Sequence, residues 1–383
     1  MPGTPSRPAV NELLPHFSAW RVMQAGTREV VDAILTPASR GPSPGLAAAL
    51  DHWPGKWYWL DEDQSRLVLV RPLVDRRPNW LLHGALMLVT VLCTLGAGAI
   101  LAGGYVPHYG RGIAGIFTSA FQFFVSVAEG DWYYLLVGWS FAVPLLAILL
   151  IHELGHYFAA RRYAIDTSPP YFLPVPPTFS PIGSLGAFIR LRSPVLDRRQ
   201  LLDVGAAGPL AGFVVAVLVL VWGYSVSDRI PIVVGSAPSY VTIAGHPVFL
   251  GESLLTRYLR DWLLPGTGAV HLSLPAFAGW VGVFVTGLNL IPLSQFDGGH
   301  ILYGVIGRRQ SQVALLAVVG LLYLAQTSPN WYVWVILAFV VGGGRLSHPE
   351  VLMAARPIPR TRWWVGLACV LVFALTFIPH PFK

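Results

Sequence analysis

The chain has 383 residues, of which 54% are hydrophobic and only 12% are charged, with a formal net charge of +7. A soluble domain carries about twice that charged fraction, so the composition argues against an ordinary soluble protein and favours one embedded in a lipid bilayer. The positive charge comes mainly from arginines beside apolar runs, which suits an anionic membrane surface. No polar face carries clustered basic residues, so nucleic acid is not an expected partner.

The first 78 residues are predicted to form a small cytosolic α/β region. Strands are expected at Glu29–Thr36, Lys56–Leu60 and Arg66–Arg71, and a short helix at Gly45–Trp53. The chain start has no apolar core long enough for a secretory signal. Membrane entry is therefore expected to use the internal apolar segments.

The rest of the chain, residues 79–383, is predicted to be an all-α polytopic membrane protein with about six to seven transmembrane helices, since about 20 apolar residues cross a bilayer. The candidate spans are Asn79–Gly103, Trp132–Arg161, Gly205–Tyr224, Ala276–Pro292, Val313–Ala325, Trp331–Val341 and Trp363–Ile378. Polar residues interrupt Ile113–Ala128, which is expected to be an interfacial or re-entrant helix. With that topology the arginine clusters, including the one from Arg161 to Arg199, fall on one side, the cytoplasmic side.

The stretch Asp166–Gln200 is predicted to be neither a span nor a simple loop. It holds seven prolines and the strand-prone run Ile182–Leu191. Strand backbone at membrane depth requires protein or a water-filled cavity to satisfy it. A re-entrant β-hairpin beside a functional site is therefore expected here.

The strongest chemical signal is the segment His152-Glu153-Leu154-Gly155-His156, at the end of an apolar run. On a helix, positions i and i+4 share one face, so both imidazoles can reach one metal ion, and Glu153 can take a proton from a water bound there. Zinc suits such ligands, and a catalytic zinc keeps three protein ligands and an open position. Polar side chains in a span are costly unless they are paired or functional. The pattern predicts a zinc site.

A third ligand is expected elsewhere in the membrane region, and Asp297 is the best candidate. Pro292 and Gly298–Gly299 interrupt the helix around it, as a site with unusual backbone would require. By itself Asp297 could instead be the N-cap of a helix over Gly298–Ile306. His300 could lie near the metal or make an ordinary helix contact.

These residues resemble the site-2 protease family of intramembrane zinc metalloproteases over roughly Leu145–Gly307. The resemblance rests on HELGH, GSLGAF, AAGPLAG and NLIPLSQFDGGH, which begin at His152, Gly183, Ala206 and Asn289. It implies a transmembrane metalloprotease domain at 79–383 with its core at 132–307. It also implies a role for each site residue: Zn²⁺ bound by His152, His156 and Asp297, catalysis by Glu153, and a contact of Asn289 with the substrate or its carbonyl.

The expected substrate is a transmembrane segment of another protein, cleaved in the lipid bilayer. The Ile182–Leu191 strand could bind it by strand addition, with Gly183 and Gly186 as substrate-binding residues. The connection Ser225–Pro275 is too short for a PDZ domain. The chain therefore resembles the PDZ-less branch with an N-terminal extension.

Other interpretations stay open from the sequence. A zinc transporter could use the same ligands, and for it Glu153 would be replaceable. A prenyl-peptide type zinc protease would have a third ligand other than Asp297. Asn289 could simply link two helices by a hydrogen bond. The expected location is the cytoplasmic (inner) membrane of a bacterium, with a plastid membrane as the alternative.

Overall fold

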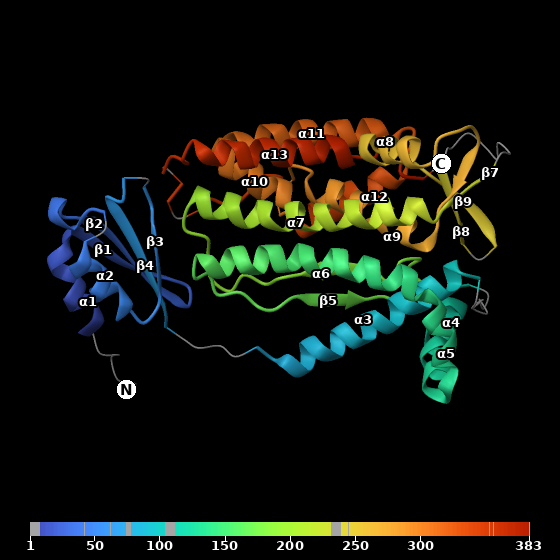
Figure 1. The fold of residues 1–383 in the computed structure, drawn as a ribbon, viewed down its shortest axis with the longest axis horizontal. Helices are drawn as coiled ribbons and strands as arrows, with labels where there is room; N and C mark the ends of the chain where they lie inside the picture. Colours follow the sequence, from blue (N-terminus) through green and yellow to red (C-terminus); the bar gives the residue numbers. More distant parts are fainter. Residues whose placement is uncertain are drawn as a thin grey trace.

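The structure is a computed structural model that describes residues 8–41, 43–61, 63–73, 78–103, 112–230, 239–243, 245–293, 295–351, 353–354 and 356–382. Helices dominate this part of the chain, as the composition predicts, and its strands form three small sheets. The long helices run side by side along the long axis of the molecule (Figure 1). A four-stranded sheet lies at one end of them, and a second such sheet lies at the other end.

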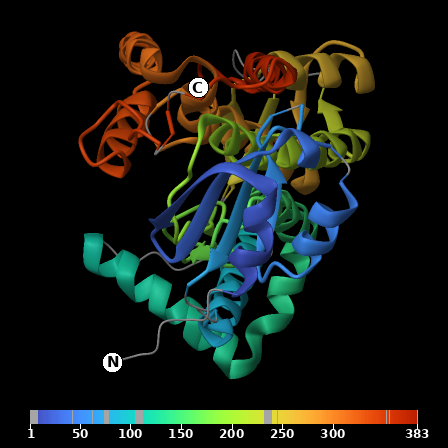
Figure 2. The ribbon, with the colours of Figure 1, turned by 90° about the vertical axis from the view of Figure 1, so that its left-hand side faces the viewer.

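The first sheet contains the strands of the N-terminal region and is covered by helices on one face (Figure 2). Its antiparallel strands lie in the order β1-β2-β4-β3: β1 (Phe17–Ala25), β2 (Arg28–Leu35), β3 (Lys56–Trp59) and β4 (Arg66–Pro72). Helices α1 (Pro8–Leu13) and α2 (Pro44–Asp51) pack on it through Leu13, Leu46 and Leu50. Three of the strands and α2 lie where the sequence predicts them. The pattern did not predict β1, because Ser18–Val22 are all exposed and the alternation of a half-buried strand is missing.

Four helical segments of the described chain are long and apolar enough, by length and composition, to cross a membrane. They are Trp80–Leu101, Trp132–Arg162, Arg198–Ser225 and Asp297–Ala325. The helices involved are α3 (Trp80–Leu101), α5 (Trp132–Leu135), α6 (Trp139–Arg162), α7 (Arg198–Ser225), α10 (Asp297–Ile306) and α11 (Gln310–Ala325). Shorter apolar helices are α9 (Leu274–Asn289), α12 (Asn330–Val341) and α13 (Thr361–Thr376). The chain is therefore an integral membrane protein with at least four candidate spans.

Polar side chains at the helix starts explain several of these boundaries. Asn79 accepts a hydrogen bond from the N–H of Leu82 before α3, and Asp197 accepts one from Gln200 before α7. Ser273 does the same before α9. Such side chains satisfy backbone donors that the first helical turn leaves unpaired. Gly307, with φ of +63°, ends α10 and separates it from α11.

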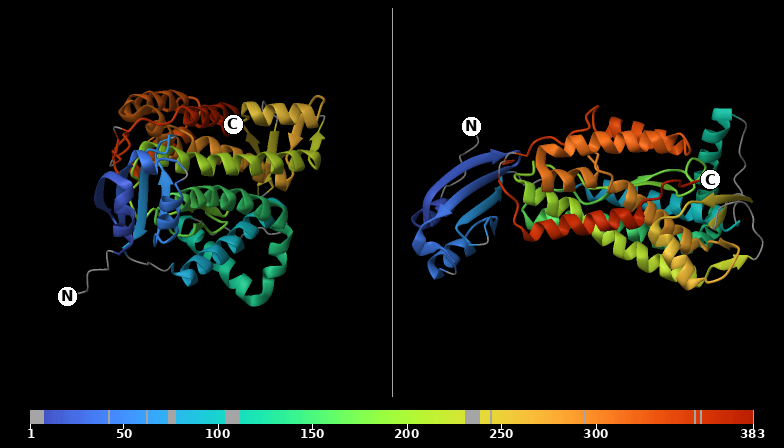
Figure 3. Two further views of the ribbon diagram at one scale, coloured as in Figure 1. Left: turned by 60° about the vertical axis from the view of Figure 1, so that its left-hand side comes forward. Right: turned by 90° about the horizontal axis from the view of Figure 1, so that it is seen from above.

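Three further features surround the bundle. Helix α4 (Gly112–Ser126) runs across the long axis of the bundle and away from it, in both Figure 1 and Figure 3. Strands β5 (Tyr171–Pro174) and β6 (Ser184–Phe188) form an antiparallel pair beside α3 and α6, inside the predicted hairpin. The connection between α7 and α9 holds α8 (Leu254–Leu263) and a sheet that the sequence did not predict, in the order β7-β10-β8-β9. Its strands are β7 (Asp228–Ile230), β8 (Ser239–Ile243), β9 (His246–Leu250) and β10 (Ala269–His271).

Helices α6, α7 and α9 form the centre of the bundle and approach one another closely. A Cβ atom at Gly155 of α6 would lie 2.5 Å from the carbonyl oxygen of Ala207 on α7. A Cβ atom at Gly223 of α7 would lie 2.2 Å from the backbone nitrogen of Ala276 on α9. Small residues permit this close packing of backbones in lipid, where apolar burial drives association less than in water. The close α6–α7 contact places the HELGH segment against α7.

Candidate metal centre

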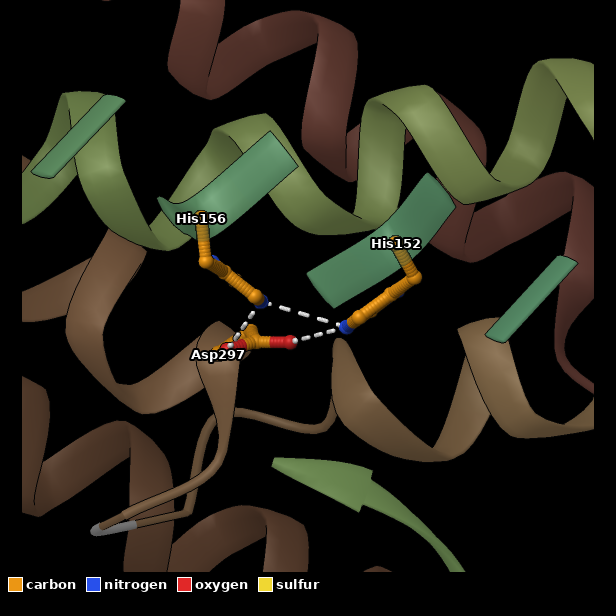
Figure 4. A group of neighbouring side chains, drawn as sticks. All are labelled: His152, His156 and Asp297. Carbon is orange, nitrogen blue, oxygen red and sulfur yellow. Dashed lines mark hydrogen bonds and ion pairs between the residues drawn. The ribbon is translucent and has the colours of Figure 1, made fainter. Parts of the chain in front are cut away.

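Three side chains from two distant parts of the sequence meet inside the bundle (Figure 4). The Nε2 atoms of His152 and His156 are 3.1 Å apart, and each lies 3.3 Å from a carboxylate oxygen of Asp297. One ligand atom from each of the three residues lies within 4.8 Å of the others. Two imidazoles and a carboxylate are a donor set that suits zinc and leaves a fourth position for water or substrate.

The hydrogen bond made by His156 supports a metal ion at this point. Its Nδ1 lies 2.7 Å from the carbonyl oxygen of Val204, which can only accept, so Nδ1 carries the proton. In the neutral ring, Nε2 then presents a lone pair toward His152 and Asp297. Lone pairs and a carboxylate that face one point repel each other unless a cation, which is a metal ion or a shared proton, lies between them. A backbone carbonyl that orients a metal-binding imidazole in this way is a common arrangement.

Helix α7 leaves room for the two imidazoles because glycines face them. A Cβ atom at Gly208 would lie 2.1 Å from His156 Nε2, and one at Gly212 would lie 3.0 Å from His152 Cβ. Both glycines belong to the AAGPLAG segment, which the sequence suggested mainly as a helix-packing motif. The structure adds a second requirement, which is space for the ligands.

The bend between α9 and α10 brings Asp297 to the histidines. A Cβ atom at Gly298 would lie 2.1 Å from the carbonyl oxygen of Leu290, so the bend requires glycine there. The N-cap position of α10 is occupied by Phe296, and Asp297 is the first residue of the helix. Its carboxylate points at His152 and His156 (Figure 4), so the alternative in which Asp297 serves only as a cap does not describe this structure.

Two further polar residues lie at the same point. Glu153 is 6% exposed, and its Oε1 is 4.0 Å from His152 Nε2. Ile189, directly after β6, lines the same cavity as Glu153. The Nδ2 atom of Asn289, the last residue of α9, is 3.3 Å from His152 Nε2. That contact also joins α9 to α6, so it fits both roles considered for Asn289 from the sequence.

A cavity of about 440 Å³ contains these groups. It brings together five of the seven site residues that the sequence predicts, His152, Glu153, His156, Asn289 and Asp297. Its wall also includes the end of β6, the first half of α7 and the connection between α12 and α13, through residues such as Ala187, Phe188, Val204, Gly205 and His348. The cavity therefore joins the metal-facing residues to a strand edge.

The other two predicted site residues, Gly183 and Gly186, do not line this cavity. A Cβ atom at Gly183 would lie 2.4 Å from the carbonyl oxygen of Cys93, so this glycine lets the hairpin pack against α3. Gly186 has φ of +101° and donates its N–H to Ser184 Oγ at 3.0 Å. Both glycines shape the hairpin, and a contact with substrate stays a prediction for them.

One residue of the cavity wall has no counterpart in the sequence-based prediction. His348 lies in the connection between α12 and α13, and its Nε2 is 2.8 Å from Nδ1 of His300. Neither periodicity nor a motif marks His348. A histidine before a proline at the end of an apolar run is a weak signal, and only the fold brings it to α10.

Comparison with known proteins gives consistent results. Residues 140–325 match Peptidase family M50. The chain is 32% identical over 245 residues to the "Probable zinc metalloprotease EGY2, chloroplastic" of Arabidopsis thaliana and 34% identical over 246 residues to the protein of that name from Oryza sativa subsp. indica. It is 30% identical over 258 residues to the "Probable zinc metalloprotease EGY1, chloroplastic" of Arabidopsis thaliana. These alignments cover 63%, 63% and 62% of the chain but 42% of each relative, so the chain spans less than half of their length. No solved structure matches.

Proposed function

We propose that this chain, whose residues 140–325 match Peptidase family M50, is an intramembrane zinc metalloendopeptidase that cleaves transmembrane segments. The observation that carries the proposal is the meeting of His152, His156 and Asp297, with Glu153 beside them, in one cavity between helices. The relatives named above are described as probable zinc metalloproteases, which gives no support to the transporter alternative.

The chemistry assigned to the site is peptide hydrolysis. Zinc held by His152, His156 and Asp297 would activate a water and polarise the scissile carbonyl. Glu153 takes a proton from the attacking water and then gives it to the leaving amine, so that one peptide bond and one water become a carboxylate and an ammonium group once the second proton of the water has also passed to the amine. Asn289 Nδ2 donates a hydrogen bond to the carbonyl oxygen as negative charge develops there.

The proposed topology has about six to seven transmembrane helices, because α9, α12 and α13 add to the four long segments. The domain at 79–383 has its core at 132–307, and residues 1–78 are a cytosolic region. Arg199 donates hydrogen bonds to carbonyl oxygens of Trp59 and Leu60, which places the arginines at the start of α7 on the side of the N-terminal sheet. In this topology α4 lies at the membrane interface and the β5–β6 pair re-enters the membrane beside α6.

The proposed substrate is a transmembrane helix that unwinds before cleavage. The backbone N–H and C=O groups of a helix are already hydrogen-bonded within the helix, so they cannot pair with the site. An extended segment therefore has to form first. One edge of β6 pairs with β5, and Ile189 after it lines the cavity that contains Glu153. The other edge of β6 is the proposed place for strand addition, which would lead an added substrate strand toward the catalytic residues. Lipid and the substrate are thus the proposed partners.

The choice of membrane stays a prediction. The sequence alone favoured a bacterial cytoplasmic membrane, with a plastid membrane as the alternative. The three relatives are described as chloroplastic, so the comparisons give no support to the bacterial choice. We propose an integral membrane location, and fractionation of the source cell identifies the type of membrane.

The first test is cleavage of a reporter transmembrane segment by purified protein, with wild type, Glu153→Gln and the exposed control Glu129→Gln compared. We expect wild type and Glu129→Gln to cleave, and Glu153→Gln to lose at least about 100-fold in rate with zinc still bound, because a positioned general base contributes roughly 100- to 10,000-fold. Equal cleavage by Glu153→Gln would overturn the role of Glu153. No cleavage by wild type, with zinc moved across liposomes by both proteins, would restore the transporter interpretation.

A further inference from the structure

Two histidines outside the proposed ligand group of His152, His156 and Asp297 share the cavity with it. They are His300 on α10 and His348 in the connection between α12 and α13. His300 Nδ1 and His348 Nε2 are 2.8 Å apart. The His348 ring also lies against the ring of Tyr303, with centroids 4.8 Å apart and planes inclined by 34°. Neither histidine has a part in the hydrolysis described above.

The segment that carries His348 is held firmly. We call residues 346–351 the strap. Gln310, which is 1% exposed, accepts a hydrogen bond from the N–H of His348 at 3.0 Å and donates to the carbonyl oxygen of Leu346 at 3.3 Å. The same amide donates to the carbonyl oxygen of Pro292 at 3.1 Å. Gln310 therefore ties the strap to the bend that delivers Asp297, and His348 keeps a fixed place relative to His300.

The hydrogen bonds determine which ring nitrogens carry protons. His348 Nδ1 lies 2.5 Å from the carbonyl oxygen of Pro349, so Nδ1 is the donor. Burial lowers the pKa of His348, which keeps the ring neutral at neutral pH and makes its Nε2 an acceptor. His300 Nδ1 must then donate to His348 Nε2. In neutral His300 the remaining nitrogen, Nε2, is left with a lone pair.

No group in the described part of the chain makes a hydrogen bond to that lone pair, and the ring lines the cavity. An unwound substrate brings backbone N–H groups into this space. Each N–H that finds no acceptor away from water costs free energy. A strand edge can pair only alternate residues of an extended segment, and the others face away from it. The N–H groups that face away from the strand edge therefore need an acceptor elsewhere in the cavity wall.

We propose that His300 is a substrate-binding residue whose unprotonated Nε2 accepts a hydrogen bond from a backbone N–H of the unwound substrate, and that His348 is the positioning residue that fixes this tautomer. The inference rests on the proposed protease function and deepens it. Because the contact is with backbone, it favours an extended conformation and not a particular side chain. The site therefore selects segments that unwind.

The first measurement compares variants that keep or remove an acceptor. Gln places an oxygen near the position of Nε2, whereas Leu has a similar volume and no acceptor. We expect His300→Leu and His348→Leu to lower kcat/KM about 5- to 10-fold, the scale of one hydrogen bond, and the two Gln variants to keep most of it. Zinc content should stay at the wild-type value in all four. Loss of zinc from His300→Leu would show that the ring supports the metal and would overturn the inference.

The second measurement replaces single backbone N–H groups of the reporter by ester oxygens, at each position near but not at the cleaved bond. We expect one position where the ester slows wild type about 5- to 10-fold and has no added effect on His300→Leu. Ester effects that are equal in wild type and His300→Leu at every position would overturn the inference and leave the protease function intact. Failure of wild type to cleave the unmodified reporter would instead remove the function on which it rests.

Discussion

The position of His156 depends on the absence of a side chain at Gly208. Alanine favours a helix over glycine by up to about 1 kcal/mol, so Gly208→Ala should cost nothing in α7 by itself. Its Cβ atom, however, would lie 2.1 Å from His156 Nε2. We expect displacement of the imidazole and a roughly 10- to 100-fold loss of zinc affinity, the scale seen when groups that orient a ligand are changed. Competition with a zinc chelator measures it.

Gly320 offers the matched control. It lies in α11, is exposed, and a Cβ atom added there meets no atom within 4 Å. Gly320→Ala should therefore leave zinc affinity and cleavage as in wild type. Full zinc affinity in Gly208→Ala would contradict the role given to α7.

Single residues of the site differ in how far the sequence could predict them. His152, Glu153 and His156 are four positions apart at most, so helical spacing alone groups them. Asp297 lies far along the chain, and only the helix breaks around it and the family resemblance pointed to it. Gly208 and His348 matter through contacts with residues on other elements, and a periodic pattern contains no information about such contacts.

The start of α7 has a buried acidic cap. Asp197 is 2% exposed and accepts a hydrogen bond from the N–H of Gln200 at 2.9 Å, while its second oxygen has no partner among the described residues. Burial raises the pKa of Asp197 above its ordinary value of 3.8, although Arg356 and Arg199 act in the opposite direction. A raised pKa means that the folded state holds the proton more tightly than the unfolded state. The resulting stabilisation is complete below pH 3.8 and is lost as pH rises through the higher folded value.

Asp197→Asn should therefore stabilise the protein at pH 7, by about 1 kcal/mol, since Asn caps helices as well as Asp and carries no charge. The gain should shrink toward pH 4. Unfolding in detergent at both values measures it, with the exposed Asp228→Asn as the control. A gain that is the same at both pH values would contradict the assignment of the effect to the buried charge.

At the scale of elements, length and periodicity decided what could be predicted. The long apolar helices α3, α6, α7 and α13 lie close to the predicted spans, because such runs have few alternative structures. The sheet between α7 and α9 was missed, because β7 and β10 have three residues each and pair across a long stretch of chain. Short strands with distant partners depend on tertiary contacts more than on their own sequence.

The whole molecule couples the N-terminal sheet to the metal-binding helix through a buried arginine. Arg28 of β2 is 1% exposed. Its Nη1 donates to the carbonyl oxygen of Ala164 at 3.1 Å, just beyond the end of α6, and its Nη2 donates to that of Pro194. A cation is favoured at the carboxyl end of a helix by the helix dipole. Burial lowers the pKa of Arg28 to about 10, so the group stays charged at neutral pH. Asp32 on the same strand forms an ion pair with Arg356 of the connection that follows the strap.

Arg28→Met keeps much of the volume of the side chain and removes every donor. We expect a loss of about 2–3 kcal/mol in the free energy of unfolding, the scale of buried hydrogen bonds to a charged group, because the carbonyl oxygens at the end of α6 lose their partner. Denaturant titration in detergent measures the loss, and Arg40→Met, an exposed arginine on the same region, is the control. Since α6 carries both histidines, cleavage should fall together with stability in Arg28→Met and stay unchanged in Arg40→Met. A joint loss of stability and cleavage would show that the N-terminal sheet supports the metal centre. A stable Arg28→Met protein with wild-type cleavage would instead show that the sheet is an independent unit.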